Sequence, residues 1–213
     1  MTAPLMVEDR IWVSTSSVGR VKPSAHRDDL RRASTLPEWR TREFLAGRAL
    51  LRELIAAVCP DLAAADIPAD PRGKPRLRGH ATVGISVSHS EGALAAGVAI
   101  GRDLGVDVQR PGSTVTPSFA RRLLRGHAPR ITALPPARAA EEVAWVWTAQ
   151  EACVKAGGAG LSGRPWTIDV PPGARAGRWG DHRWLSLRDH SPLPLSCAFS
   201  ASPRDPAHEK GER

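Results

Sequence analysis

Two long stretches of the chain carry apolar residues at the spacing of amphipathic helices. The pattern predicts one helix over 38–58, which ends before Pro60, and a second over about 138–156. A shorter helix is expected around Ser118–Arg125. Short apolar or alternating runs bounded by turn residues predict strands at 10–18, 83–88, 93–100, 104–109, 166–170, 183–188 and 195–201.

The predicted elements fall into two similar groups. Each group has a long helix followed by three short strands, and the groups are joined near 110–117. This repeat predicts an α+β fold of two similar halves, 1–112 and 113–203, with a cleft between them. Clefts of this kind commonly bind ligands. The last residues, 204–213, are expected to form a disordered tail.

Composition narrows the choice of partner. A net charge of +8 favours an anionic partner, but the basic residues form no stripe and no nucleic-acid motif is present, so nucleic acid is not expected. No apolar run has the length of a membrane span. The start lacks the layout of a signal peptide, which predicts a cytoplasmic protein. The three cysteines are far apart in apolar contexts, as expected of buried thiols.

Two arginines lie on the apolar face of the first long helix. At about 100° per residue, Arg40 and Arg48 fall in the same sector as Phe44, Leu51 and Ile55. Their stems can pack on the core while their charged ends reach solvent. Alternatively, the two arginines bind an anion in the cleft.

The second long helix carries a carboxylate in the same kind of position. Glu151 falls among Val143, Trp147 and Val154, and Lys155 follows one turn later. A plain i,i+4 ion pair is one interpretation. On an apolar face, however, a desolvated carboxylate needs a partner, which a metal ion or a ligand cation would supply.

The segment "GVDVQ" adds two oxygen-bearing side chains. In a strand, Asp107 and Gln109 point to the same side, with Cα atoms roughly 6.6 Å apart. Together with Glu151, they suit a hard cation such as Mg²⁺, with Mn²⁺ as a substitute.

Two further segments carry residues with two interpretations each. "SVSHSEG" places Ser88 and His89 at the end of a strand, where His89 is either a turn residue or part of a site. "PRGKPRL" places Lys74 on a loop, either for solubility alone or to contact an anion.

In this order and spacing, the segments resemble the 4′-phosphopantetheinyl transferases of the longer, surfactin-synthase-activating type. "EFLAGRALLREL" is similar to the family's first helix, "RGKPRL" to its Gly-Lys-Pro loop and "SVSHS" to its Ser-His strand. "GVDVQ" resembles the G-[IV]-D-x-E segment, and "WTAQEACVKAGGAGL" resembles the signature W-x-x-K-E-x-x-x-K-x-x-G-x-G-L. The resemblance extends over residues 40–161.

The resemblance implies a pseudo-twofold monomer with coenzyme A in the cleft and an acidic apo carrier protein beside it. The activity implied is Mg²⁺-dependent transfer of 4′-phosphopantetheine from coenzyme A to a carrier serine. Residues matching the metal positions are Asp107, Gln109 and Glu151. Those matching the coenzyme A phosphate positions are Arg40, Arg48, Lys74, Ser88, His89 and Lys155. Glu151, Lys155 and Asp107 are the expected catalytic residues.

Two departures from the family pattern support an alternative. Gln109 stands where many members have Glu, and Gln150 stands where many have Lys. The first removes a negative charge from the metal site, and the second removes a cation near the pyrophosphate. The alternative is a homologue that binds coenzyme A or a carrier protein without catalysis.

The short helix has two interpretations as well. Its apolar residues are Phe119, Leu123 and Leu124, and its basic residues are Arg121, Arg122 and Arg125. It is either part of the carrier-docking face or a peripheral helix of the core.

Overall fold

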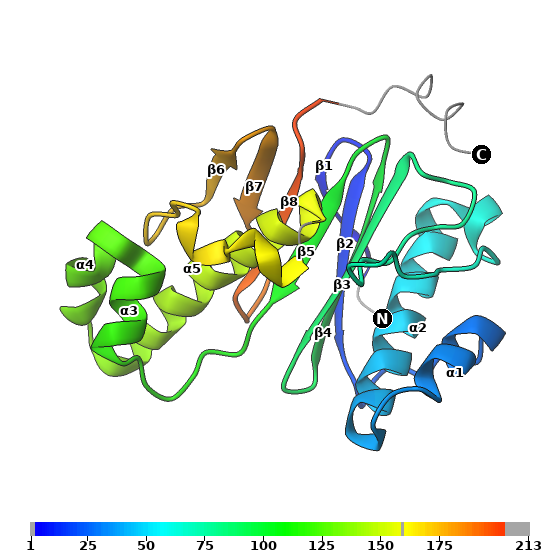
Figure 1. Cartoon of the computed structure of the whole chain (residues 1–213), viewed down its shortest axis with the longest axis horizontal. Coiled ribbons are helices and arrows are strands. Elements are labelled where there is room, and N and C mark those ends of the chain that lie inside the picture. The colour runs from blue at the N-terminus through cyan, green and yellow to red at the C-terminus, as the bar shows by residue number, and fades with distance from the viewer. Residues whose placement is uncertain (1–2, 159, 203–213) are drawn as a thin grey trace.

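The computed structural model describes residues 3–158 and 160–202, and Figure 1 shows two sheets with a long helix on the outer side of each. The helices are α1 (Arg27–Ala33), α2 (Glu38–Val58), α3 (Pro117–Leu124), α4 (Ala128–Thr132) and α5 (Pro136–Gly157). The strands are β1 (Leu5–Glu8), β2 (Ile11–Ser17), β3 (Val83–Ser90), β4 (Ala93–Ile100), β5 (Leu104–Val108), β6 (Ala176–Trp179), β7 (His182–Ser186) and β8 (Leu195–Ser200). The expected α+β fold class is confirmed. The tail expected at 204–213 lies outside the described residues.

Each sheet has four antiparallel strands. The first has the order β1-β2-β4-β3, and the second has the order β5-β8-β7-β6. Strand β5 follows β4 closely in sequence but pairs with β8, so the chain enters the second sheet before residue 112. The division of the chain at residue 112 stays a prediction. None of the described helices combines the length and apolar composition that a bilayer crossing needs.

Three apolar clusters hold these layers together. Helix α2 buries Leu50 and Leu54 against the first sheet, and α5 buries Val146 against the second. Between the sheets, Val106 and Phe199 belong to a central cluster that includes residues of β2 and β4. Complete burial of one such side chain contributes about 1.5–3 kcal/mol relative to an exposed one.

The thiols of the chain lie within this packing or at its edge. Cys153 and Cys197 are buried, and burial raises the pKa of each thiol to about 12. Cys59 is half-buried, and burial raises its pKa as well. All three are unpaired thiols, as expected from the sequence.

One strand prediction is wrong. Residues 166–170 do not form a strand, because the chain makes a 3₁₀ turn over Pro165–Thr167. Pro165 fixes the first φ of that turn, and Pro171 and Pro172 lack the N–H groups that a strand would donate. The apolar residues of this segment still contribute to packing, since Ile168 and Val170 are buried in the core beside α5.

The two sheets meet where β3 lies beside β5. A parallel bridge joins Val83 to Arg102, just before β5 begins. Beyond it, three serine hydroxyls on β3 accept hydrogen bonds from backbone amides at and just after β5. The pairs are Ser86 with Val106 (2.9 Å), Ser88 with Val108 (3.3 Å) and Ser90 with Arg110 (3.1 Å). We call Ser86, Ser88 and Ser90 the serine seam.

Candidate active site

A glycine brings β5 against α5. A Cβ atom at Gly105 would lie 2.0 Å from the carbonyl oxygen of Ala152 and 2.5 Å from the amide nitrogen of Ala156. No side chain fits in that space. The close approach places Asp107, two residues along the strand, beside the part of α5 that carries Lys155.

Asp107 is the centre of a buried polar cluster. Only 6% of the surface of Asp107 is exposed. One carboxylate oxygen, Oδ1, accepts hydrogen bonds from Lys155 Nζ at 2.6 Å and from Ser88 Oγ at 2.7 Å. Lys155 Nζ also donates to the carbonyl oxygen of Val106 at 3.2 Å. No hydrogen bond to the other oxygen, Oδ2, is found among the described residues.

Glu151 lies one turn before Lys155 on α5 and is half-buried. Burial is the main cause that raises the pKa of its carboxyl, and the negative charge of Asp107 raises it further; Lys155 opposes both. Lys155 forms its ion pair with Asp107 rather than with Glu151. The plain i,i+4 pair is therefore not what this helix forms. The ammonium group of Lys155 instead bonds to Asp107, and it acts on Glu151 only through its charge.

A basic cavity of about 330 Å³ lies between α2, the loop before β3 and the end of β3. It brings together three of the residues expected to bind phosphate: Arg40, Arg48 and His89. The rest of its lining comprises Arg32, Leu36, Glu43, Phe44, Gly47, Ala69, Gly73, Pro75 and Val87. Lys74 is flanked by two lining residues. Ser88 is not part of the lining.

Arg48 is buried, with 7% of the residue exposed. Its Nε lies 3.8 Å from Oδ1 of the buried Asp29, and its guanidinium lies over the ring of Phe44 at 5.1 Å. Its Nη1 is buried without a hydrogen-bond partner among the described residues. Burial lowers the pKa of Arg48, which Asp29 partly offsets. The head does not snorkel to solvent, and an acceptor in the cavity would complete its hydrogen bonds.

Asp29 links α1 to α2 through contacts with two arginines of α2. Its Oδ2 accepts from Arg52 Nε at 2.7 Å and from Ser24 Oγ at 2.7 Å. Arg52 also donates to the carbonyl oxygen of Ala65 at 3.0 Å. Arg52 therefore neutralises much of the charge of Asp29, and Arg48 keeps part of its hydrogen-bonding capacity for the cavity.

His89 is paired with an acid inside the same cavity. Its Nδ1 lies 3.2 Å from Oε2 of Glu43 on α2. Burial lowers the pKa of His89, Glu43 raises it, and the cations Lys155 and Arg40 lower it again. His89 lines the basic cavity, and the residue before it, Ser88, is hydrogen-bonded to Asp107 of the Asp107–Lys155 cluster.

Lys74 connects the loop before β3 to the second half. Its Nζ donates to the carbonyl oxygen of Ala156, near the end of α5, at 2.7 Å, and lies 3.9 Å from Oδ1 of Asp103. Its side chain is largely buried by these contacts. The ammonium group of Lys74 therefore contacts the backbone of the residue that follows Lys155 on α5, and it does not point freely into solvent.

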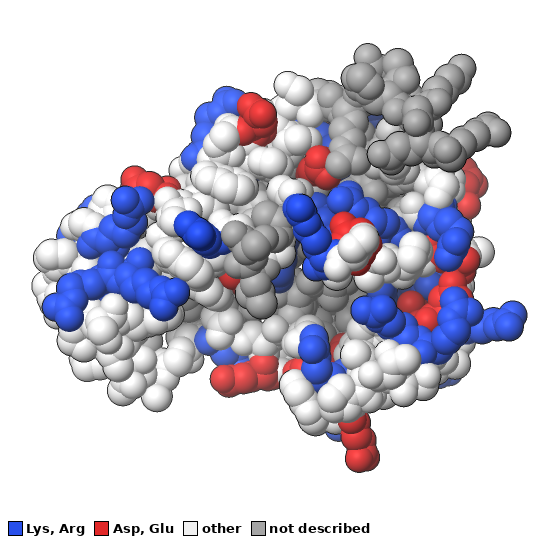
Figure 2. Space-filling view, viewed as in Figure 1, with Lys and Arg blue, Asp and Glu red and all other residues white. Residues whose placement is uncertain are grey.

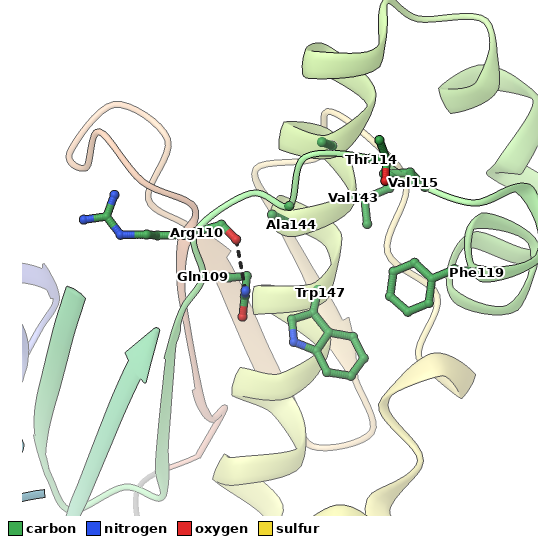
Figure 3. Close-up of a pocket in the computed structure, with 10 residues that line it drawn as sticks. Gln109, Arg110, Thr114, Val115, Phe119, Val143, Ala144 and Trp147 are labelled. Atoms are coloured by element: carbon green, nitrogen blue, oxygen red, sulfur yellow. Dashed lines mark hydrogen bonds between the residues drawn. The ribbon is translucent and has the colours of Figure 1, made fainter. Parts of the chain in front are cut away.

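Gln109 and Gln150 occupy different surroundings. Gln109 Nε2 donates to the carbonyl oxygen of Arg110 at 3.0 Å, and Figure 3 shows its side chain beside Trp147 at the edge of a second cavity of about 230 Å³. Gln150 is 1% exposed, and its Nε2 donates to the carbonyl oxygens of Leu123 and Ile168. The Gln150 side chain thus ties α3 and the 3₁₀ turn to α5, within the core.

The short helix α3 divides its residues between core and surface. Leu123 and Leu124 are buried in the cluster around α5, while Phe119 is exposed and borders the second cavity. The arginines are exposed, and Figure 2 shows basic side chains gathered over the end of the molecule that holds α3 and α4. The apolar face therefore serves the core and the basic face is open.

A second group of possible metal ligands lies at the start of α1. Ligand atoms of His26, Asp28 and Asp66 lie within 4.8 Å of one another. Two arginines already pair with it, Arg31 with Asp28 at 2.5 Å and Arg78 with Asp66 at 3.3 Å. This cluster is separate from the residues expected to bind metal.

Several residues of the site were not predicted from the sequence. Glu43 shares the helix face of Arg40 at i,i+3, and that spacing is a signal that points to it. Asp29 and Asp103 carry no comparable signal, because their partners are distant in sequence. The alternation of Ser86, Ser88 and Ser90 is visible in "SVSHS" as one polar face of a strand.

The fold and this site define an α+β protein with a basic cavity beside one buried and one half-buried carboxylate. Residues 27–99 match the family model described as "4'-phosphopantetheinyl transferase N-terminal domain". The match covers about a third of the 213 residues and supports the 4′-phosphopantetheinyl transferase superfamily. It includes Arg40, Arg48, Lys74, Ser88 and His89 and ends before Asp107.

A similar solved structure is a holo-(acyl-carrier-protein) synthase from Bacillus anthracis in complex with CoA (3',5'-ADP). It is 22% identical, covers 42% of this chain and 93% of that chain, and has a TM-score of 0.37. At this TM-score the overlap is partial and does not define the fold of the whole chain. No curated protein sequence matches the chain.

Proposed function

We propose that the protein is a 4′-phosphopantetheinyl transferase of the longer, surfactin-synthase-activating type. The observation that carries the proposal is the position of the basic cavity, with Arg40, Arg48 and His89, beside the Asp107–Lys155–Glu151 cluster. The cavity has the charge that coenzyme A phosphates need, and Nη1 of Arg48 is an unused donor. The cluster has the groups that phosphoryl transfer needs.

The proposed reaction moves 4′-phosphopantetheine from coenzyme A to a serine of an apo acyl or peptidyl carrier protein. The serine oxygen attacks the phosphorus that bears the pantetheine arm, and a new O–P bond forms. The bond between that phosphorus and the bridging oxygen of the pyrophosphate breaks, so adenosine 3′,5′-bisphosphate leaves. The serine proton passes to Glu151, directly or through a water molecule. The raised pKa of Glu151 favours this role, because it brings the base closer to neutral pH.

The carboxylates fit a divalent cation. Asp107 Oδ2 has no hydrogen bond among the described residues, and a cation would offset the burial and repulsion that raise the pKa of Glu151. Asp107 and Glu151 would hold the ion, with the amide oxygen of Gln109 as a neutral third ligand. Bound Mg²⁺ supplies charge stabilisation at the pyrophosphate. Lys155 would then neutralise charge on the phosphates, and Lys74 would add positive charge from the loop before β3.

A carrier protein would dock beside α3. Its three exposed arginines form an open basic face near Phe119, which suits an acidic partner. Arg122 is held over the ring of Trp166 at 4.4 Å, so part of this face is ordered in advance. Reversal of Arg121 and Arg122 to Glu should raise the KM for the carrier at low salt. An unchanged KM would exclude this face.

The test of the proposed function is the mass of apo carrier proteins after incubation with coenzyme A and Mg²⁺. We expect a gain of one phosphopantetheine on at least one acyl or peptidyl carrier. The matched control is the same carrier with its serine changed to alanine, which should gain nothing. No gain on any carrier of a broad panel would contradict the proposal.

One observation favours a second candidate, a homologue that binds coenzyme A or a carrier without catalysis. The amide of Gln109 bonds to its own neighbour and borders the second cavity, so the third ligand is weak. Calorimetry separates the candidates. Binding of coenzyme A without any transfer would support the non-catalytic homologue, whereas binding with transfer would support the enzyme.

A further inference from the structure

We propose that Ser88 is the positioning residue of Asp107. This inference rests on the proposed function, because Asp107 is a metal ligand only in that account. Within the serine seam, all three hydroxyls accept an amide hydrogen bond from the strand opposite. Among the contacts of the described residues, Ser88 alone of the three donates to a carboxylate, at 2.7 Å from Oδ1 of Asp107. It therefore has a contact that its two neighbours lack.

The position of the hydroxyl proton follows from the groups around it. The oxygen of Ser88 accepts from the amide of Val108 at 3.3 Å, so its hydrogen is available to a second group. The carboxylate of Asp107 is an acceptor when ionised, and it lies within reach. A hydroxyl bonded to a carboxylate is a strong, charge-assisted hydrogen bond. Ser88 is 5% exposed, so water does not compete easily.

The contact fixes the orientation of Asp107. Ser88 approaches Oδ1 from β3 in the first sheet, and Lys155 approaches the same oxygen from α5. Two donors on Oδ1 restrain rotation of the carboxylate and leave Oδ2 for a ligand. Second partners of this kind typically change metal affinity by about 10–100-fold when they are removed.

The contact also connects the two halves of the molecule at the site. Ser88 is two residues from the seam's other members along β3 and one residue from His89, which lines the basic cavity. The strand that presents the cavity's histidine therefore also orients the carboxylate at the reaction centre. In this assignment Ser88 acts on the metal side of the site.

The experiment measures Mn²⁺ binding to the full-length chain by electron paramagnetic resonance, without coenzyme A. Ser88→Ala should weaken Mn²⁺ binding about tenfold. Ser86→Ala is the matched control, because it removes the same kind of amide bond from the seam without touching Asp107. It should change Mn²⁺ binding less than about threefold. Thermal unfolding should show similar losses for the two variants.

Further variants locate the effect. Asp107→Asn should abolish the binding that Ser88→Ala weakens, and Ser88→Ala should add nothing in that background. If Ser88→Ala does not fold, Ser88→Cys keeps a side chain of similar size with a weak donor and should show the same weakening. Equal Mn²⁺ affinities for the Ser88 and Ser86 variants would overturn the positioning role and leave the proposed function intact.

Two outcomes would contradict both the metal-ligand role of Asp107 and the positioning role of Ser88. Mn²⁺ binding that is unaffected by Asp107→Asn would place the ion elsewhere. The absence of Mn²⁺ binding to the wild type would leave Asp107 without the proposed role as a metal ligand. Transfer measured by carrier mass then decides separately whether the protein is a transferase.

Discussion

Asp107 joins most of the interactions at the site, and its two carboxylate oxygens have different surroundings. Oδ1 is held by Lys155 and Ser88, whereas Oδ2 has no hydrogen bond among the described residues. The charge of Asp107 also raises the pKa of Glu151, so the two acids are coupled. Removal of a charged metal ligand from this site should therefore reduce activity more than removal of a neutral one.

Replacement of the three expected metal ligands should therefore rank them. Glu151→Ala removes a charged ligand and the proposed base, and should lower the transfer rate at least ~100-fold, roughly 2.7 kcal/mol. Gln109→Ala should cost less, since water can replace a neutral ligand of Mg²⁺. Gln109→Glu should retain activity and lower the Mg²⁺ concentration required. Rates measured by carrier mass give the ranking, and equal severe losses would make Gln109 a full ligand.

His89 should contribute to acid sensitivity. Burial lowers its pKa in the folded protein below the value of about 6.5 expected in the unfolded chain. The unfolded chain therefore takes up a proton first, and the free energy of unfolding falls as the pH drops through 6.5 towards the folded pKa. His89→Gln should flatten this part of the profile in urea unfolding between about pH 7.5 and 5. A profile that stays as steep would mean that His89 is not desolvated.

Between elements, the contact of β5 with α5 depends on Gly105. A methyl group there would meet backbone atoms of Ala152 and Ala156 at 2.0 and 2.5 Å, and the backbone cannot yield as a side-chain end can. Gly105→Ala should lower the free energy of unfolding by about 2–4 kcal/mol and reduce activity more than stability alone explains. Gly126→Ala is the control, since nothing lies within 4 Å of its Cβ position. Equal urea midpoints for the two variants would contradict this packing.

The elements themselves were largely predictable from the sequence. Periodicity located α2 and α5 within two residues at each end, because long amphipathic patterns average out local exceptions. It failed at 166–170, where prolines outweigh an apolar run. It also missed β6, whose four residues do not alternate between apolar and polar types in the sequence. The helix α1 was missed as well, since its seven residues are mostly polar.

The site was predictable only where a motif carried it. Arg40, Arg48 and His89 come together in one cavity, and Asp107 lies beside Lys155. The buried Asp29 and the contact of Lys74 with the end of α5 follow from tertiary packing, which no local pattern encodes. The bond between Ser88 and Asp107 likewise depends on how β3 and β5 meet.

At the scale of the whole molecule, the proposed reaction needs both halves. Arg40, Arg48 and His89 of the cavity come from α2 and β3, whereas Lys155 and Glu151 come from α5. Lys74 and the serine seam cross between these parts. Coenzyme A bound in the proposed way would contact both halves. Substitutions in the two halves should therefore have different effects. Cavity residues should affect its binding, and the carboxylate cluster should affect the chemical step.

The most direct test therefore compares three proteins: the wild type, Arg40→Met and Asp107→Ala. For each, kcat and the KM for coenzyme A are measured from the mass gain of an apo carrier. Arg40→Met should raise KM at least about fivefold with kcat nearly unchanged, because it removes a contact made equally in ground and transition states. Asp107→Ala should lower kcat at least ~100-fold. Excess chelator should abolish transfer by the wild type. Transfer by Asp107→Ala at nearly the wild-type rate, or unimpaired transfer in chelator, would contradict the account.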